Sequence, residues 1–565
     1  MDTQFPLAPV SDLPWLAYAS LLVIAVYFRF SRALTIRNLD LILTLLIAAA
    51  VVVSSHFRDA AYSSDPDKSV AAALNATEQS SAVDVPQNQS GYASPDDVAE
   101  ERRTTASVDL TAVPTPDARQ ANAAGTRTTV AVESSSTSAG DDALLVGRSP
   151  TASRAQSEMS MIDSRKHPLH LWSTWALMVL AVLLVIRLLF DESLTRRPRL
   201  DQNLNLAGLT FLCVPAFAIL AFGVFLKPAP LTNVKAIEHG RALLQRREVE
   251  VSRTDVIGDV PAPTETLLAA GGAAMAQLSG TLPNSVSVNT GQTRDTELLV
   301  ARILVVVAHL VVILGLLYIG RQHFASLQLG VAMSCLYLLL PCTAANVHKL
   351  SHVLPAACLI WAIASYRKPT VAGVLLGLAC GTLFFAVFLL PLWAVFYGRR
   401  GAIRFGVSVL GVVAVLATCL LMISGDADSF FNRVVTSTNW TVYRLLDDTL
   451  SVSQESVSRL FIRIPMAAIF FVMLTAMTVL PRPRNLENLL ANSTALVVAA
   501  QMWYPDDIGT YAQWYMPLFL LVVFRPRLDR FMPPEMIERQ TTTLSNDTPA
   551  GSPSTVAMSR LRLHR

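Results

Sequence analysis

Residues Tyr366–Arg400 read YRKPTVAGVLLGLACGTLFFAVFLLPLWAVFYGRR, a long apolar run with basic residues at both ends. In membrane proteins, short loops rich in Arg and Lys lie on the cytoplasmic side. A run that crossed the membrane once would place its two basic ends on opposite sides. The side on which each end lies therefore decides the fold.

The composition is that of a polytopic membrane protein. Of the 565 residues, 52% are hydrophobic and 15% are charged, and the mean hydropathy is +0.44; an average soluble protein has about 25% charged residues. The apolar residues form blocks of about 17–23 residues, which suits helices crossing a hydrocarbon core about 30 Å thick. The net charge of +3, spread over short loops, argues against a nucleic-acid partner.

The N-terminal residues argue against a cleavable signal peptide, and the cysteines argue against disulfides and a zinc site. The opening residues MDTQFPLAPVSDLPW lack the basic region of a cleavable signal peptide, so the first apolar block is predicted to be a retained span. All six cysteines lie in or beside apolar blocks, without CxxC or CxxH spacing. We expect buried free thiols, with no disulfide, no zinc site and no cofactor.

The distribution of basic loops predicts a reversal of chain direction. The apolar blocks lie at approximately 13–28, 39–54, 170–190, 205–226, 298–320, 325–342, 351–365, 370–397, 403–424, 461–480, 486–503 and 512–524. If the basic loop at 29–37 is cytoplasmic, those at 196–199, 321 and 367–368 fall on the same side. The loop GRRGAIR at 398–404 is also basic. All these loops are cytoplasmic only if residues 369–398 enter and leave on one side.

A helical hairpin satisfies this condition. One helix of about 30 residues would extend about 45 Å and end on the wrong face, whereas two full spans need about 40 residues. We predict two short helices broken near Cys380-Gly381-Thr382, packed within the protein. The alternative is one long tilted helix with arginines on both sides. The predicted fold class is an all-α, polytopic transmembrane helix bundle with about eleven full spans plus one re-entrant helical hairpin.

The chain divides into five parts. Residues 1–55 form an N-terminal two-span unit, and 56–168, rich in Ser, Thr, Ala, Asp and Gln, are predicted to be a disordered extracytoplasmic insertion. Residues 169–204 form a third span with its cytoplasmic loop. A membrane core follows at 205–524, with an external loop at 227–297, and 525–565 form a disordered cytoplasmic tail.

The external loop 227–297 holds candidate catalytic carboxylates. Its first part, TNVKAIEHGRALLQRR, has the spacing of an amphipathic helix at the membrane surface. Glu238 there is a candidate general base with His239 beside it, because partial desolvation raises the pKa of a carboxyl toward the range that suits base catalysis. Asp255 and Asp259 are alternative carboxylates. A plain solvated surface helix is the alternative interpretation.

A second cluster, NVHKLSH, contains His348, Lys349 and His352 between two spans. A lysine that supplies charge and a histidine that supplies a hydrogen bond suit a lipid phosphate. The alternative is a boundary loop whose lysine reaches the interface. No acidic residue lies nearby in the sequence, so a metal site is not expected.

Two further sets of residues are candidates for substrate binding. Arg302 and His309 lie seven residues apart on one face of the fifth block, and ionisable groups inside a membrane often serve function. The alternative is that Arg302 snorkels to the membrane surface and that His309 is a neutral, hydrogen-bonded histidine. The last external loop brings Tyr511 and Trp514 close to Asp506 and Asp507. Aromatic faces beside carboxylates suit a sugar, although Trp and Tyr also form ordinary interfacial belts.

The run from Pro341 to Arg404 resembles the core of polyprenyl-phosphate-dependent glycosyltransferases of the glycosyltransferase-C superfamily, especially the family-87 mannosyltransferase-like proteins. The matching order is NVHKLSH, a returning span, YRKP, then AGVLLGLACGTLFFAVFLLPLW and GRR; the late GTYAQWYMPLFLLVVF also resembles the family pattern. The resemblance covers residues 205–524. Two features depart from it: the Asp expected soon after the preceding span is absent, leaving Glu238 as the nearest match, and a lysine often found at the hairpin break is missing.

This resemblance implies a membrane glycosyltransferase. A lipid-linked sugar donor would bind from within the bilayer among membrane lipids, and an extracytoplasmic acceptor would approach from outside. Glu238 or Asp255 would serve as base, and Lys349 and His348 would hold the phosphate. The expected location is a bacterial inner membrane, with the N-terminus outside and the C-terminus cytoplasmic. The alternative function is a non-catalytic transporter, or a scaffold for residues 56–168.

Overall fold

We describe the protein from a computed structural model. It describes residues 12–32, 35–63, 168–193, 202–249, 260–280, 290–382, 384–437, 454–480, 483–503, 511–526, 528 and 531–534. The chain divides into two compact units, Met1–Ala60 with Asp163–Arg565, and Ala61–Ile162. Apart from the end of one helix at 61–63, every described residue belongs to the first unit. The predicted insertion at 56–168 and tail at 525–565 lie mostly outside the described residues.

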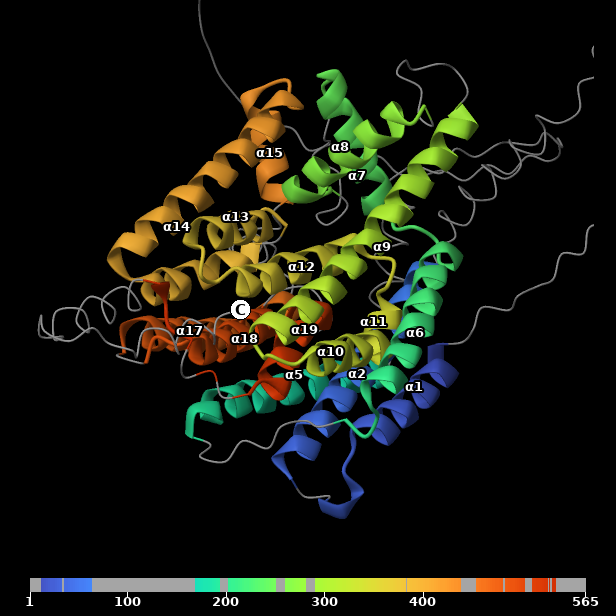
Figure 1. The fold of residues 1–565 in the computed structure, drawn as a ribbon. Coiled ribbons are helices and arrows are strands. Elements are labelled where there is room, and N and C mark those ends of the chain that lie inside the picture. Colours follow the sequence, from blue (N-terminus) through green and yellow to red (C-terminus); the bar gives the residue numbers. More distant parts are fainter. Residues whose placement is uncertain are drawn as a thin grey trace, which may run out of the picture. The chain divides into compact units, whose positions relative to one another are not determined.

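All regular structure in the described ranges is helical (Figure 1). Each predicted apolar block corresponds to a helix or a helical segment. The α-helices are α1 (Asp12–Tyr27), α2 (Ile36–Ser63), α5 (Pro168–Leu189), α6 (Leu206–Leu226), α7 (Leu231–Gln245), α8 (Pro263–Leu278), α9 (Thr290–Gln322), α10 (Leu327–Leu339), α11 (Pro341–Ala345), α12 (Leu350–Ala364), α13 (Pro369–Cys380), α14 (Leu389–Met422), α15 (Ala427–Ser437), α17 (Gln454–Val479), α18 (Leu486–Met502) and α19 (Ala512–Phe524).

Five apolar helical segments among the described residues are long enough to cross a membrane. They are Ile36–Ser55, Trp172–Leu189, Leu206–Leu226, Asp295–Gln322 and Phe385–Met422. The protein is thus an all-α membrane protein, as the composition predicts.

Short, fully buried helices form the core of the first unit. α19 is buried along its whole length, and α10 and α18 nearly so. By contrast, α6 and α17 expose large apolar side chains, such as Phe211 (82% exposed) and Val472 (70%). A helix that is apolar on all sides belongs in a protein core, and extended apolar surface on the outer helices suits contact with lipid.

The chain reverses its direction between α13 and the second part of α14. α13 packs along that part through glycines, and the order of the contacts shows that both segments run the same way. The contacts join Gly373 to Phe405, Gly377 to Val412, and Gly381 to Leu416. Residues 384–397 connect the two segments and must therefore return in the opposite direction. Tyr397 at the end of the return lies against Phe405, with ring centroids 5.6 Å apart.

Local sequence explains both turns of this reversal. α13 ends at Cys380, close to the predicted break, and the 3-10 helix η3 (Phe384–Phe388) begins the return. The second turn is at Gly398, whose backbone has φ 73° and ψ −178°, so α14 consists of two helices joined there. Glycine adopts this positive φ without the steric cost that a side chain would bring. The 38-residue apolar segment Phe385–Met422 is consequently not one straight span.

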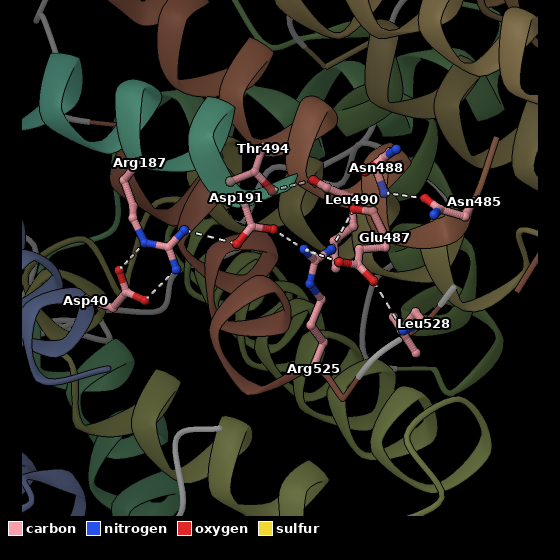
Figure 2. Close-up of polar contacts among 10 residues, drawn as sticks. All are labelled: Asp40, Arg187, Asp191, Asn485, Glu487, Asn488, Leu490, Thr494, Arg525 and Leu528. Atoms are coloured by element: carbon pink, nitrogen blue, oxygen red, sulfur yellow. Dashed lines mark hydrogen bonds and ion pairs between the residues drawn. The ribbon is translucent and has the colours of Figure 1, made fainter. Parts of the chain in front are cut away.

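A buried network of charges joins α2, α5, α18 and α19 (Figure 2). Arg187 on α5 binds Asp40 on α2 at 2.8 Å and Asp191 at 3.0 Å. Arg525, at the C-terminal end of α19, pairs with Asp191 and lies 3.3 Å from Glu487 on α18. Alternating charges allow these groups to lie inside the protein, where a lone charge would be costly. The network fixes one end of α19, whose other end carries Trp514.

Candidate functional site

Most of the predicted substrate-binding residues lie where several helix ends meet. We call this region the junction: it comprises the N-terminal ends of α7, α8 and α19, residues 346–349 between α11 and α12, and residues 381–388 after α13. Side-chain hydrogen bonds to backbone carbonyls hold it together. Asn233 Nδ2 on α7 donates to His348 O at 2.8 Å, and Trp514 Nε1 on α19 donates to Ser351 O at 3.2 Å.

The N-terminus of α8 docks on the break after α13. Thr264 donates its backbone N–H to Gly381 O at 3.1 Å and its hydroxyl to Leu378 O at 2.7 Å. These bonds satisfy carbonyls that α13 leaves unpaired where it ends. A methyl group added at Gly381 would lie 2.4 Å from Thr264 Oγ1 and 2.3 Å from Leu416 Cδ1, so both side chains would have to move to accommodate it.

The carboxyl group buried at the junction is Glu265. It lies in the first turn of α8 with 3% of its surface exposed. Its Oε2 accepts a hydrogen bond from Ala262 N at 3.3 Å, while Oε1 is buried without a hydrogen-bond partner. Burial raises the pKa of Glu265 to about 7. The adjacent Thr266 hydroxyl is also buried without a partner. A carboxyl with this pKa can take up and release a proton near neutral pH.

Of the two carboxylates proposed from the sequence, the structure describes only Glu238. Glu238 is exposed on α7, and the neighbouring His239 is buried on another side of that helix. Asp255 lies outside the described residues, as do Asp259 and the pair at 506–507. Sequence reasoning missed Glu265. A helix start is visible in PAPTE, with Pro263 at the first helical position and a glutamate two residues on, but its burial could not be read from that pattern.

The predicted phosphate cluster is cationic and contains unsatisfied polar atoms. His348 and Lys349 are half-buried, and His348 Nδ1 has no hydrogen-bond partner. Burial, Lys349 and Lys227 together lower the pKa of His348 to about 3, so its imidazole is neutral at physiological pH. Asn346 is 1% exposed, and neither its side-chain oxygen nor its nitrogen has a partner. Buried polar groups normally form hydrogen bonds, so the unpaired side-chain atoms of this loop are available to bind a ligand.

The aromatic candidates form one stack at the junction. Trp514 is sandwiched between Phe385, at 4.3 Å and 11° between ring planes, and Tyr511, at 4.0 Å and 21°. His352 lies 4.8 Å from the Tyr511 ring. The structure thus brings His352, Tyr511 and Trp514 together and adds Phe385 from the return segment. Trp514 is buried, whereas Tyr511 is half-buried and closer to solvent.

The α9 candidates have separate roles. The ring nitrogens of His309 lie 2.9 Å from Tyr337 Oη (Nδ1) and 3.1 Å from Val347 O (Nε2). His309 therefore contacts the backbone of the 346–349 loop. Arg302 is half-buried with Nε unpaired, and it makes no hydrogen bond or ion pair to the junction within the described ranges. His309 follows the simpler of the two interpretations, a hydrogen-bonded buried histidine.

The arrangement combines a proton acceptor, cations and an aromatic surface. Within the described ranges, no group of three or more His, Cys, Asp or Glu side chains could hold a metal ion. No protein-family model, curated protein or solved structure matches the chain.

Proposed function

We propose that this protein is a membrane glycosyltransferase that transfers a sugar from a polyprenyl-phosphate donor to an extracytoplasmic acceptor. The observation that supports it most is Glu265. This carboxyl lies in the external loop 227–297, at the break of the chain reversal, and burial places its pKa at about 7. Glu265 is therefore a better candidate base than Glu238, which is exposed.

The chemistry assigns one task to each part of the junction. Glu265 takes the proton of the acceptor hydroxyl as that oxygen bonds to the anomeric carbon of the sugar. The bond from this carbon to the phosphate oxygen breaks, and its electron pair leaves with the polyprenyl phosphate. Lys349 stabilises the leaving phosphate by charge, and neutral His348 by a hydrogen bond. The stack of Tyr511 on Trp514 offers an aromatic face to the sugar.

The proposal includes a topology. Residues 369–398 form a re-entrant hairpin with both ends in the cytoplasm, and the other helical blocks supply about eleven spans. The N-terminus lies outside, the C-terminus lies inside, and the membrane is a bacterial inner membrane. The shared direction of α13 and the second part of α14 supports the hairpin, because the segment between them must return to its starting side.

The test compares two glutamates in the same loop. Full-length protein in liposomes is incubated with polyprenyl-phosphate-mannose or polyprenyl-phosphate-glucose and an extract of cell-envelope acceptors, and release of polyprenyl phosphate is measured. Glu265→Gln should lower the rate by roughly 10²- to 10⁴-fold, the usual contribution of a general base. Glu238→Gln should leave it unchanged. Equal activity of both variants would contradict the role of Glu265, whereas no release by the wild-type protein would favour the non-catalytic alternative, a transporter or scaffold.

A further inference from the structure

A second polar site lies between α7 and α15, away from the residues proposed for sugar transfer. Its centre is Arg433 on α15, which is 0% exposed. Arg433 Nη1 donates to His239 Nδ1 at 3.4 Å, and Nη2 donates to the carbonyl oxygen of Val249. The Nε–H of Arg433 is buried without a hydrogen-bond partner.

Within the part of the chain that the structure describes, the positive charge of Arg433 has no compensating carboxylate. Among the described residues, no Asp or Glu forms an ion pair with it, and the nearby acids Glu238 and Glu248 are both exposed. Burial lowers the pKa of Arg433, but a guanidinium stays protonated in proteins. A buried charge is normally paired, because its desolvation is otherwise too costly.

His239 makes the site more receptive to an anion. Burial, Arg433 and Lys235 lower the pKa of His239 to about 4, so the ring is neutral at physiological pH. An arginine can only donate hydrogen bonds, so Nδ1 of His239 must accept and its proton must be on Nε2. The site therefore offers an unpaired N–H on Arg433, in a positive local field, and no negative charge from His239.

We propose that Arg433 binds a phosphoryl oxyanion through its unpaired Nε–H. A guanidinium presents its N–H groups in a fixed fork that matches phosphate oxygens, and charge-assisted bonds of this kind are about twice as strong as neutral ones. Either a lipid headgroup or a free phosphate supplies this chemistry. Phe431 on α15 is 59% exposed and Leu421 at the end of α14 is also 59% exposed, so apolar surface lies beside the site. The proposal does not depend on the sugar-transfer function.

The experiment measures binding and thermal protection with two probes. Full-length protein in zwitterionic nanodiscs is titrated with inorganic phosphate at constant ionic strength set by chloride. In parallel, nanodiscs containing phosphatidic acid are compared with phosphatidylcholine alone. Wild-type protein should bind one probe or both and unfold at a higher temperature when it does. Arg433→Met should raise Kd roughly 10- to 100-fold, as expected for loss of hydrogen bonds to a charged group.

Matched variants distinguish binding at Arg433 from a general effect of positive charge on anion binding. Arg247→Met removes an exposed arginine of the same region and should leave Kd unchanged. Arg433→Lys keeps the charge without the fork and should bind between wild type and Arg433→Met. Without any probe, Arg433→Met should unfold no lower than wild type, because it removes an unpaired buried charge. If only inorganic phosphate raises the unfolding temperature, the ligand is a free anion. If only phosphatidic acid raises it, the ligand is a lipid headgroup.

The proposal fails under two results. One is a wild-type protein that neither probe protects beyond the chloride control. The other is protection that Arg433→Met and Arg247→Met retain equally.

Discussion

Arg187 on α5 binds both carboxylate oxygens of Asp40 on α2, through Nε at 2.8 Å and Nη2 at 2.9 Å (Figure 2). The two residues are 147 positions apart in the sequence, and Asp40 is 3% exposed. This two-point contact has the planar geometry that arginine and carboxylate adopt when they pair strongly. Through Asp191 and Arg525 the same network reaches α19, which carries the aromatic stack at its other end.

The first prediction follows from this pair. Arg187→Met should lower the free energy of unfolding by about 3 kcal/mol, because it leaves the buried Asp40 carboxylate without its partner. The double variant Arg187→Met with Asp40→Leu should recover most of that loss, since an apolar pair avoids the desolvation cost. Thermal unfolding in detergent measures both, and Arg404→Met, at an exposed arginine, is the control. A double variant as unstable as the single one would contradict this account.

The second prediction concerns the pH dependence of stability. The pKa of Glu265 is about 7 in the folded protein and 4.5 is its ordinary value. Between these values the folded state holds a proton that the unfolded state releases, so stability falls as pH rises from 4.5 to 7. Glu265→Gln has no carboxyl group to titrate, so its stability lacks this loss between pH 4.5 and 7. At pH 8 it should be more stable than wild type by about 3 kcal/mol, from a difference of about 2.5 pKa units at 1.36 kcal/mol each.

The measurement is chemical or thermal unfolding of both proteins from pH 4.5 to pH 8. The difference between Glu265→Gln and wild type should grow steadily across this window. A constant difference would mean that Glu265 titrates at its ordinary pKa, and its use as a base near neutral pH would lose support.

The third prediction tests the docking of α8 on the chain break. Gly381→Ala should destabilise the protein and separate Thr264 from the break, since the added methyl would meet Leu416 and Thr264 atoms within 2.4 Å. Gly411→Ala in the second part of α14 is the matched control, because its methyl would meet nothing within 4 Å. Alanine there should stabilise the helix by about 0.5–1 kcal/mol. Unfolding temperatures that shift in the same direction would contradict the packing described here.

Sequence periodicity and length predict the helices well but not the buried polar contacts. Blocks of apolar residues correspond to helices because the length and periodicity of an apolar segment can be read directly from the sequence. Burial of Glu265 depends instead on where α8 docks, which involves Gly381 more than a hundred positions away. Arg525 illustrates the same limit. A basic residue after an apolar block predicts a cytoplasmic loop, yet its side chain is buried against Asp191 and Glu487.

The candidate site was predictable to the extent that its residues lie in short loops. His352, Tyr511 and Trp514 were each recognisable as polar or aromatic residues at the ends of apolar blocks, and the structure places them in one stack. Phe385 was hidden inside an apolar run, because only the reversal of the chain brings it to Trp514. Arg433 was likewise one arginine among many until its burial and its contact with His239 were known.

The last prediction concerns the reversal itself. If residues 369–398 form a re-entrant hairpin, cysteines at Lys368 and Arg400 should be accessible from the same side of the membrane. Both positions are exposed, and they avoid Gly398, where any side chain would be strained by the positive φ. The six natural cysteines, all free thiols, are first replaced by serine or alanine. An impermeant thiol reagent is then applied to intact cells and to inverted vesicles.

Labelling of both Lys368→Cys and Arg400→Cys in inverted vesicles only would place both ends in the cytoplasm. The shared direction of α13 and the second part of α14 requires that both positions be labelled from one side, because two segments that run the same way must start on the same side. Opposite labelling would make 369–398 a single tilted span and reverse the side of every later loop. Tyr511 and Trp514 would then lie on the cytoplasmic side, where they could not contribute to transfer onto an extracytoplasmic acceptor.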